Sequence, residues 1–236
     1  VYDRPEFAVP ASVEVLCDSA PGGARLLWPD TLGQEALLAA RAESVTGYEP
    51  LLPSRVAAVH ARLRGTWQWL SAEGQARLFA ENAGLLGRMG LGCLLSARGD
   101  PDLFGQAGFR LAGESPDGVR IYRYPGGLPR SRLVFDAWRA GSGAEALDAV
   151  LGDFVDPLKS VVLEGEGPPL PGCSGSPGGA SEISAYRAEE VRVRTSSACP
   201  AYLVLADTHM PGWTATVDGR PAPILRPPIL FRAVEL

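Results

Sequence analysis

Short runs of alternating or continuous apolar residues fill the second half of the chain. Asp218-Gly219 stands between two of these runs, and Asp-Gly is a strong signal for a two-residue hairpin turn of type I′. Both residues of this turn are therefore expected to adopt positive φ. The runs predict strands over 183–194, 201–206, 213–217 and 222–236.

Helical and strand patterns alternate over the first 164 residues. Ser142 and Glu145 have the spacing of a capping box, which predicts a helix from that point onward. Residues 12–17 fit either a short helix or a strand. The remaining periodicity predicts helices over 31–38, 54–63 and 76–89, and strands over 25–28, 91–95, 109–114, 119–124, 133–138 and 160–164.

A stretch rich in Gly, Pro and Ser separates these two regions. Of its 17 residues, six are Gly, four are Pro and three are Ser, so it has almost nothing apolar to bury. We predict an α+β protein with a mixed α/β domain over 1–164, a linker or long exposed loop over 165–181, and a β-sandwich-like portion over 182–236. The last portion is short, so we expect it to pack on the first rather than fold alone.

Composition and charge exclude several classes of protein. Among the 236 residues, 46% are apolar and 21% are charged, as in an ordinary globular protein. The net charge of −5 argues against a partner nucleic acid, because such binding depends on clustered Lys and Arg. The sequence has no run of the ~18–20 apolar residues that span a bilayer. Starting at Val1 without a signal-peptide profile, it is expected to be a segment of a longer protein.

The four cysteines predict a disulfide and no metal site. No C-x-x-C spacing occurs, and there are only two histidines, so neither a zinc site nor any other metal or cofactor is expected. Cys173 in the Gly/Pro/Ser stretch and Cys199 before a strand are candidates for a disulfide. Cys17 and Cys93 are interpreted as buried thiols.

No catalytic residue is predicted. His209 follows Asp207-Thr208, but there is no G-x-S-x-G motif, and a residue beside a turn is the simpler interpretation. Glu189-Glu190 or the pair Glu164 and Glu166 could serve a glycosidase, although such carboxylates are usually solvated. The glycines of 84–90 fit close helix packing better than a phosphate loop. The five tryptophans could stack on sugars, but core filling is favoured.

Gly47-Tyr48-Glu49-Pro50 is the segment in which we look for a binding site. On a functional interpretation, Tyr48 stacks on or hydrogen-bonds a sugar or a lipid-linked substrate, while Glu49 accepts hydrogen bonds from hydroxyls. The alternative is a tight turn whose Tyr48 packs on the core. Both interpretations stay open at this point.

The last fifty residues carry the most specific pattern. Residues 201–224 contain a strand, Pro211-Gly212-Trp213, a second strand and Asp218-Gly219, and the pattern ends near 230–234. This block resembles the C-terminal extracytoplasmic region of the YfhO-like family of bacterial polytopic membrane proteins. In that family, a block of this kind is a structural motif of the region. Weaker similarities to the same family occur earlier in the chain, over 44–51, 85–95 and 119–130, in the same order as in the family. The resemblance therefore covers most of the chain.

The resemblance implies a parent with many transmembrane helices, similar to GT-C glycosyltransferases that move sugars from polyprenyl-phosphate donors onto cell-envelope acceptors. Their catalytic acid lies in an early extracytoplasmic loop that this chain lacks, so no catalytic residue is carried over. The implied role is a non-catalytic domain on the extracytoplasmic face of the cytoplasmic membrane. Its partners would be the membrane-spanning remainder of the polypeptide and a glycan or polyprenyl-linked sugar. The Trp content and β-rich C-terminal part support an alternative, a free-standing carbohydrate-binding or adhesion module of the cell envelope.

Overall fold

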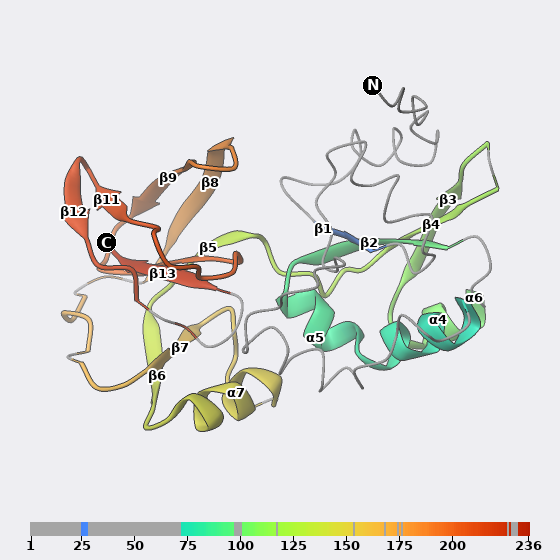
Figure 1. The fold of residues 1–236 in the computed structure, drawn as a ribbon, viewed down its shortest axis with the longest axis horizontal. Coiled ribbons are helices and arrows are strands. Elements are labelled where there is room, and N and C mark those ends of the chain that lie inside the picture. The colour runs from blue at the N-terminus through green and yellow to red at the C-terminus, as the bar shows by residue number, and fades with distance from the viewer. Residues whose placement is uncertain are drawn as a thin grey trace, which may run out of the picture. The chain divides into compact units, whose positions relative to one another are not determined.

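The computed structural model is mostly β, with several small sheets (Figure 1). Two compact units divide the chain, Val1–Leu52 with His60–Leu128 and Pro53–Val59 with Pro129–Leu236. Within the ranges that the structure describes, no helix has both the length and the hydrophobicity needed to cross a bilayer. Those ranges are 25–27, 72–96, 101–116, 118–152, 154–167, 169–173, 175, 177–225, 227 and 231–236.

The first unit contains a four-stranded sheet in the order β1-β2-β4-β3. β1 runs parallel to β2, whereas β2 and β3 are both antiparallel to β4. Three helices, α4, α5 and α6, lie together below this sheet in Figure 1. The elements are β1 Arg25–Leu27, α4 Ala72–Glu81, α5 Ala83–Arg88, β2 Leu91–Ser96, α6 Pro101–Gln106, β3 Arg110–Glu114 and β4 Arg120–Arg123.

The core of the first unit surrounds β2, a nearly continuous apolar run. Continuous apolar runs suit central strands that are buried on both faces. Phe104 from α6 packs on Tyr122 of β4 with a ring-centroid distance of 4.9 Å. Gly87 of α5 lies so close to Tyr124 that a Cβ at this position would overlap the ring. Close packing, the interpretation favoured from the sequence, therefore holds for Gly87, whereas Gly84 faces open space.

The second unit is built around the antiparallel sheet β13-β10-β5. β6 and β7 form a parallel pair joined by α7, because parallel strands need a long crossover connection. Two hairpins, β8–β9 and β11–β12, complete the unit. The elements are β5 Ser131–Val134, β6 Asp136–Ala140, α7 Gly143–Leu151, β7 Ser160–Glu164, β8 Gly179–Tyr186, β9 Val191–Ser197, β10 Tyr202–Leu205, β11 Ala215–Val217, β12 Arg220–Ala222 and β13 Arg232–Glu235.

The core of the second unit draws on segments from both sides of the Gly/Pro/Ser stretch. α7 begins at the predicted cap, where Ser142 Oγ accepts a hydrogen bond from the Glu145 backbone N–H at 3.2 Å. Its apolar face packs on β6 and β7. The main buried cluster consists of Val134, Val161, Leu163, Tyr202, Val204, Ala206, Phe231 and Ala233.

Four predicted elements differ from the observed ones. The helix expected over 76–89 is divided into α4 and α5, and the range 222–236 contains the end of β12 and then β13 instead of one strand. The single strand expected over 133–138 is two strands, because β5 pairs with β10 whereas β6 pairs with β7. The backbone N–H of Phe135, between them, donates to the Lys159 carbonyl at 3.2 Å. Residues 183–194 form a hairpin rather than one strand, with a turn closed by the hydrogen bond from Arg187 N–H to the Glu190 carbonyl. Helix α6 was not predicted.

The unit boundary also differs from the expected domain boundary. Because β5 pairs with β10, residues 129–164 belong to the same unit as 182–236. The stretch 165–178 has no helix or strand among its described residues, which are mostly exposed, and β8 starts at Gly179. Composition shows where the chain is loop-like, but it does not show which strands pair across the loop.

We predict that a fragment of residues 182–236 gives no cooperative thermal transition in circular dichroism. It lacks β5, Val161 and Leu163, and with them one neighbour of β10 and part of the core. A fragment of residues 129–236 keeps the whole sheet and should unfold cooperatively. A cooperative transition of the shorter fragment would contradict this account.

The β11–β12 turn yields a second prediction. Asp218 and Gly219 have φ of 49° and 77°, and Val217 pairs with Arg220, as a type I′ turn requires. Gly219→Val should lower the free energy of unfolding by about 1–3 kcal/mol, because a β-branched residue is strained at positive φ. Gly113→Val is the control, since Gly113 has open space and no positive φ. Equal effects of the two substitutions in urea unfolding would rule out the strain.

Candidate binding groove

A groove of about 1190 Å³ lies between the hairpins β8–β9 and β11–β12. We call it the hairpin groove. The strands β10 and β13 form its floor, and the segment 211–218 with Ile224 forms one wall. In Figure 1 both hairpins lie on the side of the sheet β13-β10-β5 opposite to α7. Its volume is at the upper end of that of small-molecule pockets, and it is open to solvent.

Apolar and polar residues both line the hairpin groove, and the half-buried ones are almost all apolar. Along β9, Val191 and Val193 are half-buried, whereas Arg192 and Arg194 between and beyond them are exposed. This alternation is the normal two-residue period of a strand with one face turned to the interior. The half-buried apolar lining residues are Ala185, Val191, Val193, Leu203, Trp213, Ala215, Val217, Ile224, Val234 and Leu236.

A buried ion cluster lies next to this groove. The carboxylate of Asp207 accepts a hydrogen bond from Arg130 Nη2 at 2.7 Å and another from Arg232 Nη2 at 2.9 Å. The guanidinium of Arg130 lies 4.3 Å from the ring centroid of Tyr186, and that of Arg232 lies 4.1 Å from Trp213. We call these five residues the Asp207 cluster. It ties the ends of β8, β10 and β13 to the wall of the groove.

The charged groups of the Asp207 cluster are buried. Two guanidinium groups share one carboxylate, and the three charged residues are 2–8% exposed. Burial lowers the pKa of Arg232, and the nearby Asp207 carboxylate opposes this shift. The aromatic faces of Tyr186 and Trp213 offset part of the desolvation cost through cation–π attraction. The stability of the buried charges therefore depends on all five residues of the cluster.

The segment Pro211-Gly212-Trp213 brings the tryptophan onto this cluster. Gly212 has a φ of 97°, which residues with a side chain rarely adopt. The turn allows the chain to leave β10 after Asp207 and return to the groove wall at β11. The motif that the sequence singled out thus positions an aromatic ring on Arg232.

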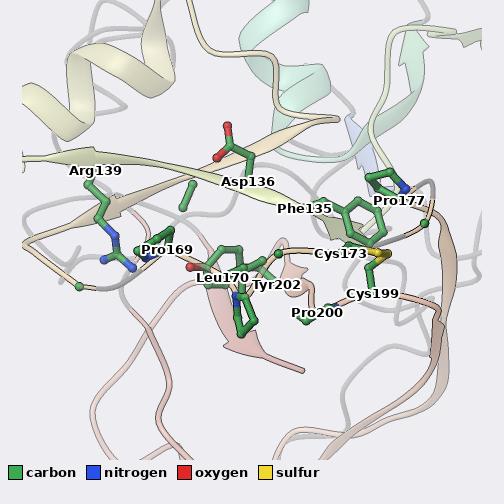
Figure 2. A pocket seen from close by; sticks show the side chains of 15 residues that line it. Phe135, Asp136, Arg139, Pro169, Leu170, Cys173, Pro177, Cys199, Pro200 and Tyr202 are labelled. Atoms are coloured by element: carbon green, nitrogen blue, oxygen red, sulfur yellow. A yellow bond between two sulfur atoms is a disulfide. The ribbon is translucent and has the colours of Figure 1, made fainter.

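A second cavity lies beside the Gly/Pro/Ser stretch. It has a volume of about 620 Å³ and is bounded by four prolines, Phe135, Tyr202, Gly167, Leu170 and Cys173. Figure 2 shows Arg139 reaching toward Pro169, whereas the carboxylate of Asp136 points away from the prolines. Asp136 accepts a hydrogen bond from Ser160 Oγ at 3.1 Å.

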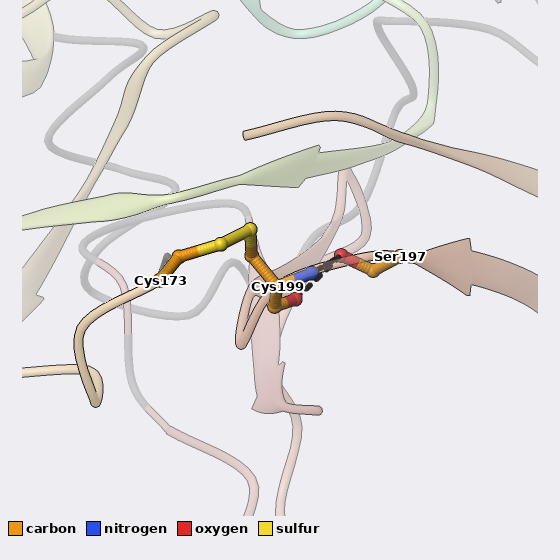
Figure 3. Close-up of a disulfide and its surroundings, with 3 residues drawn as sticks. All are labelled: Cys173, Ser197 and Cys199. Atoms are coloured by element: carbon orange, nitrogen blue, oxygen red, sulfur yellow. Dashed lines mark hydrogen bonds between the residues drawn. A yellow bond between two sulfur atoms is a disulfide. The ribbon is translucent and has the colours of Figure 1, made fainter. Parts of the chain in front are cut away.

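A disulfide joins Cys173 in this loop to Cys199 before β10 (Figure 3). These are the two cysteines identified as candidates from the sequence, and the Cα–Cα distance is 5.4 Å. Ser197 holds the Cys199 backbone, because its hydroxyl donates to the Cys199 carbonyl and accepts from its N–H. Cys93 is a buried free thiol whose pKa is raised by desolvation.

Of the remaining sequence candidates, Glu189 and Glu190 line the hairpin groove, whereas His209 does not. His209 is half-buried after β10, and Glu189 and Glu190 lie at the tip of the β8–β9 hairpin. Glu190 is paired with Arg192 at 2.9 Å. In the part of the chain that the structure describes, no group of three or more His, Cys, Asp or Glu side chains could hold a metal ion.

Tyr48 and Glu49 lie outside the described residues, so their role in binding stays a prediction. The Asp207 cluster was missed in the sequence. Asp207 is 77 residues from Arg130 and 25 from Arg232, so no local motif joins them. The usable signal is Arg at strand positions that a buried apolar residue would normally occupy, as in Arg132 and Arg232.

We predict that Asp207→Asn lowers the free energy of unfolding by about 3–5 kcal/mol, because it removes the carboxylate that both buried guanidinium groups contact. Urea unfolding followed by tryptophan fluorescence measures this loss. Glu190→Gln removes the carboxylate of an exposed ion pair and should leave stability unchanged. A result for Asp207→Asn as small as for Glu190→Gln would show that the cluster does not contribute to stability.

Comparison with family models, with curated proteins and with solved structures gives no match to this chain. Its function is therefore inferred from the groove, the disulfide and the sequence pattern.

Proposed function

We propose that this chain is a non-catalytic extracytoplasmic domain of a multi-spanning bacterial membrane protein. The parent would be a YfhO-like, GT-C-type glycosyltransferase acting on cell-envelope glycans or lipids, and the domain would contribute acceptor binding or structural support. The observation that carries the proposal is the disulfide between Cys173 and Cys199. Structural disulfides persist in oxidising compartments and are rare in the bacterial cytosol, which favours the extracytoplasmic face of the cytoplasmic membrane.

The arrangement of the second unit supports a binding or supporting role. We infer an α+β fold whose C-terminal part is sandwich-like, with the hairpins β8–β9 and β11–β12 as a partial second layer over the sheet β13-β10-β5. The Asp207 cluster and the disulfide hold this unit at two separate places. A rigid unit with an open groove suits the positioning of a ligand, or contact with the membrane-spanning remainder of the same polypeptide.

A glycan or polyprenyl-linked sugar is the small ligand that this role implies. Trp213 is half-buried on the wall of the hairpin groove, and tryptophan rings are common stacking surfaces for sugars. A partner nucleic acid does not fit, since the chain has a net charge of −5. No residue is assigned a catalytic role.

The position of Trp213 also favours the second candidate, a free-standing carbohydrate-binding or adhesion module of the cell envelope. The gene sequence upstream of Val1 separates the two. Many hydrophobic spans before this domain would support the membrane protein, whereas a secretory signal peptide alone would support the free-standing module.

The redox state of the cysteines in the native cell tests the proposed location. Cells are quenched in acid and the thiols are alkylated before and after reduction, so that mass spectrometry reports each cysteine separately. We expect Cys173 and Cys199 to react only after reduction, because they are bonded in an oxidising compartment. Cys93 is the internal control, since the denatured thiol should react in both samples. Reduced Cys173 and Cys199 in the native cell would contradict the extracytoplasmic assignment.

A further inference from the structure

We propose that the hairpin groove accepts an extended polypeptide segment as an additional β-strand along β9. This segment would carry apolar side chains at every second position and carboxylates at the positions between them. The inference goes beyond the proposed function, because it assigns a protein partner to the groove whatever the compartment.

The first observation is the free edge of β9. β8 and β9 form a two-stranded sheet, and β8 lies toward β5, to which it is joined by the hydrogen bond from Ser181 Oγ to Ser131 Oγ at 3.2 Å. The other edge of β9 has no strand partner among the described residues. Such an edge presents unpaired backbone N–H and C=O groups, which are the usual template for an added strand.

The second observation is the row of apolar side chains beside that edge. Val191 and Val193 of β9 are half-buried on one wall of the groove, and Ala215 and Val217 of β11 are half-buried on the other. Leu203 belongs to the floor. A strand between these walls would bury this surface with every second side chain and leave the intervening ones in solvent.

The charged residues on the solvent face of β9 favour a partner strand that carries carboxylates. Arg192 and Arg194 are exposed on this face of β9. Arg192 is already paired with Glu190, whereas Glu182 of β8 lies directly opposite Arg194. A carboxylate on the far side of Arg194 would extend this row of alternating charge across three strands. A cation at the same place would face a like charge, which is destabilising in cross-strand pairs.

The lining favours a polypeptide over a glycan for this groove. Trp213 is the one aromatic residue of the lining, and the Arg232 guanidinium covers one face of its ring. Apart from Glu190, whose carboxylate is already paired with Arg192, the other half-buried lining residues are aliphatic and cannot hydrogen-bond sugar hydroxyls through their side chains. A strand needs only backbone pairing and aliphatic contact, and β9 offers both.

The test uses the full 236-residue chain and fluorescein-labelled peptides as long as the seven residues of β9. One peptide alternates valine with glutamate, and the second alternates valine with lysine. We expect fluorescence anisotropy to show saturable binding of the glutamate peptide and at least about tenfold weaker binding of the lysine peptide. Arg194→Glu should reverse this preference, whereas Arg187→Glu, at the exposed hairpin tip and outside the groove lining, should not.

Val193→Ser tests the apolar contact separately, and circular dichroism checks that each variant is folded. It should weaken both peptides without changing the charge preference. The proposal is overturned if the glutamate peptide does not bind, or if both peptides bind equally to the native chain. It is also overturned if a cell-envelope oligosaccharide displaces the labelled peptide and unlabelled peptide does not, or if the chain dimerises through this groove. These outcomes do not depend on cysteine labelling, so the location and the partner can fail independently.

Discussion

The buried carboxylate of Asp207 is the interaction on which the second unit depends. It accepts hydrogen bonds from Arg130, just before β5, and from Arg232, the first residue of β13. Buried charges are tolerated only when they are paired and hydrogen-bonded, so the three chain segments that carry these residues must stay together. Tyr186 and Trp213 extend the constraint to β8 and to the segment before β11, because each ring lies against one of the guanidinium groups.

The apolar core and the disulfide act on the other side of the same sheet. Residues of β6 and β7 join β5, β10 and β13 in one buried cluster, and α7 covers part of β6 and β7. The Cys173–Cys199 bond attaches the Gly/Pro/Ser loop just before β10, so a segment with little apolar surface still has a defined path. The sheet is thus braced by aliphatic packing and a covalent link on one side and by ion pairs toward the hairpins.

The core, the disulfide and the ion pairs leave the hairpin groove open to solvent. The Asp207 cluster contacts the β8–β9 hairpin through Tyr186, next to its tip, and the β11–β12 hairpin through Trp213, just before β11. Between these contacts the aliphatic residues of β9 and β11 remain half-buried. Apolar surface arranged along a free strand edge favours association with another chain. The disulfide, the groove and the P-G-W segment all belong to the second unit, and therefore the proposed location and the proposed partner concern the same part of the molecule.

Features that depend on a few neighbouring residues could be read from the chain. Asp218 and Gly219 form the expected turn and Ser142 caps α7, because these choices reflect local backbone preferences. Three other features could not be predicted from the sequence: the break at Phe135, the pairing of β5 with β10, and the contact of Asp207 with two distant arginines. Strand partners and buried ion pairs are selected by packing and desolvation over the whole unit, and these energies are defined only when distant segments are already side by side.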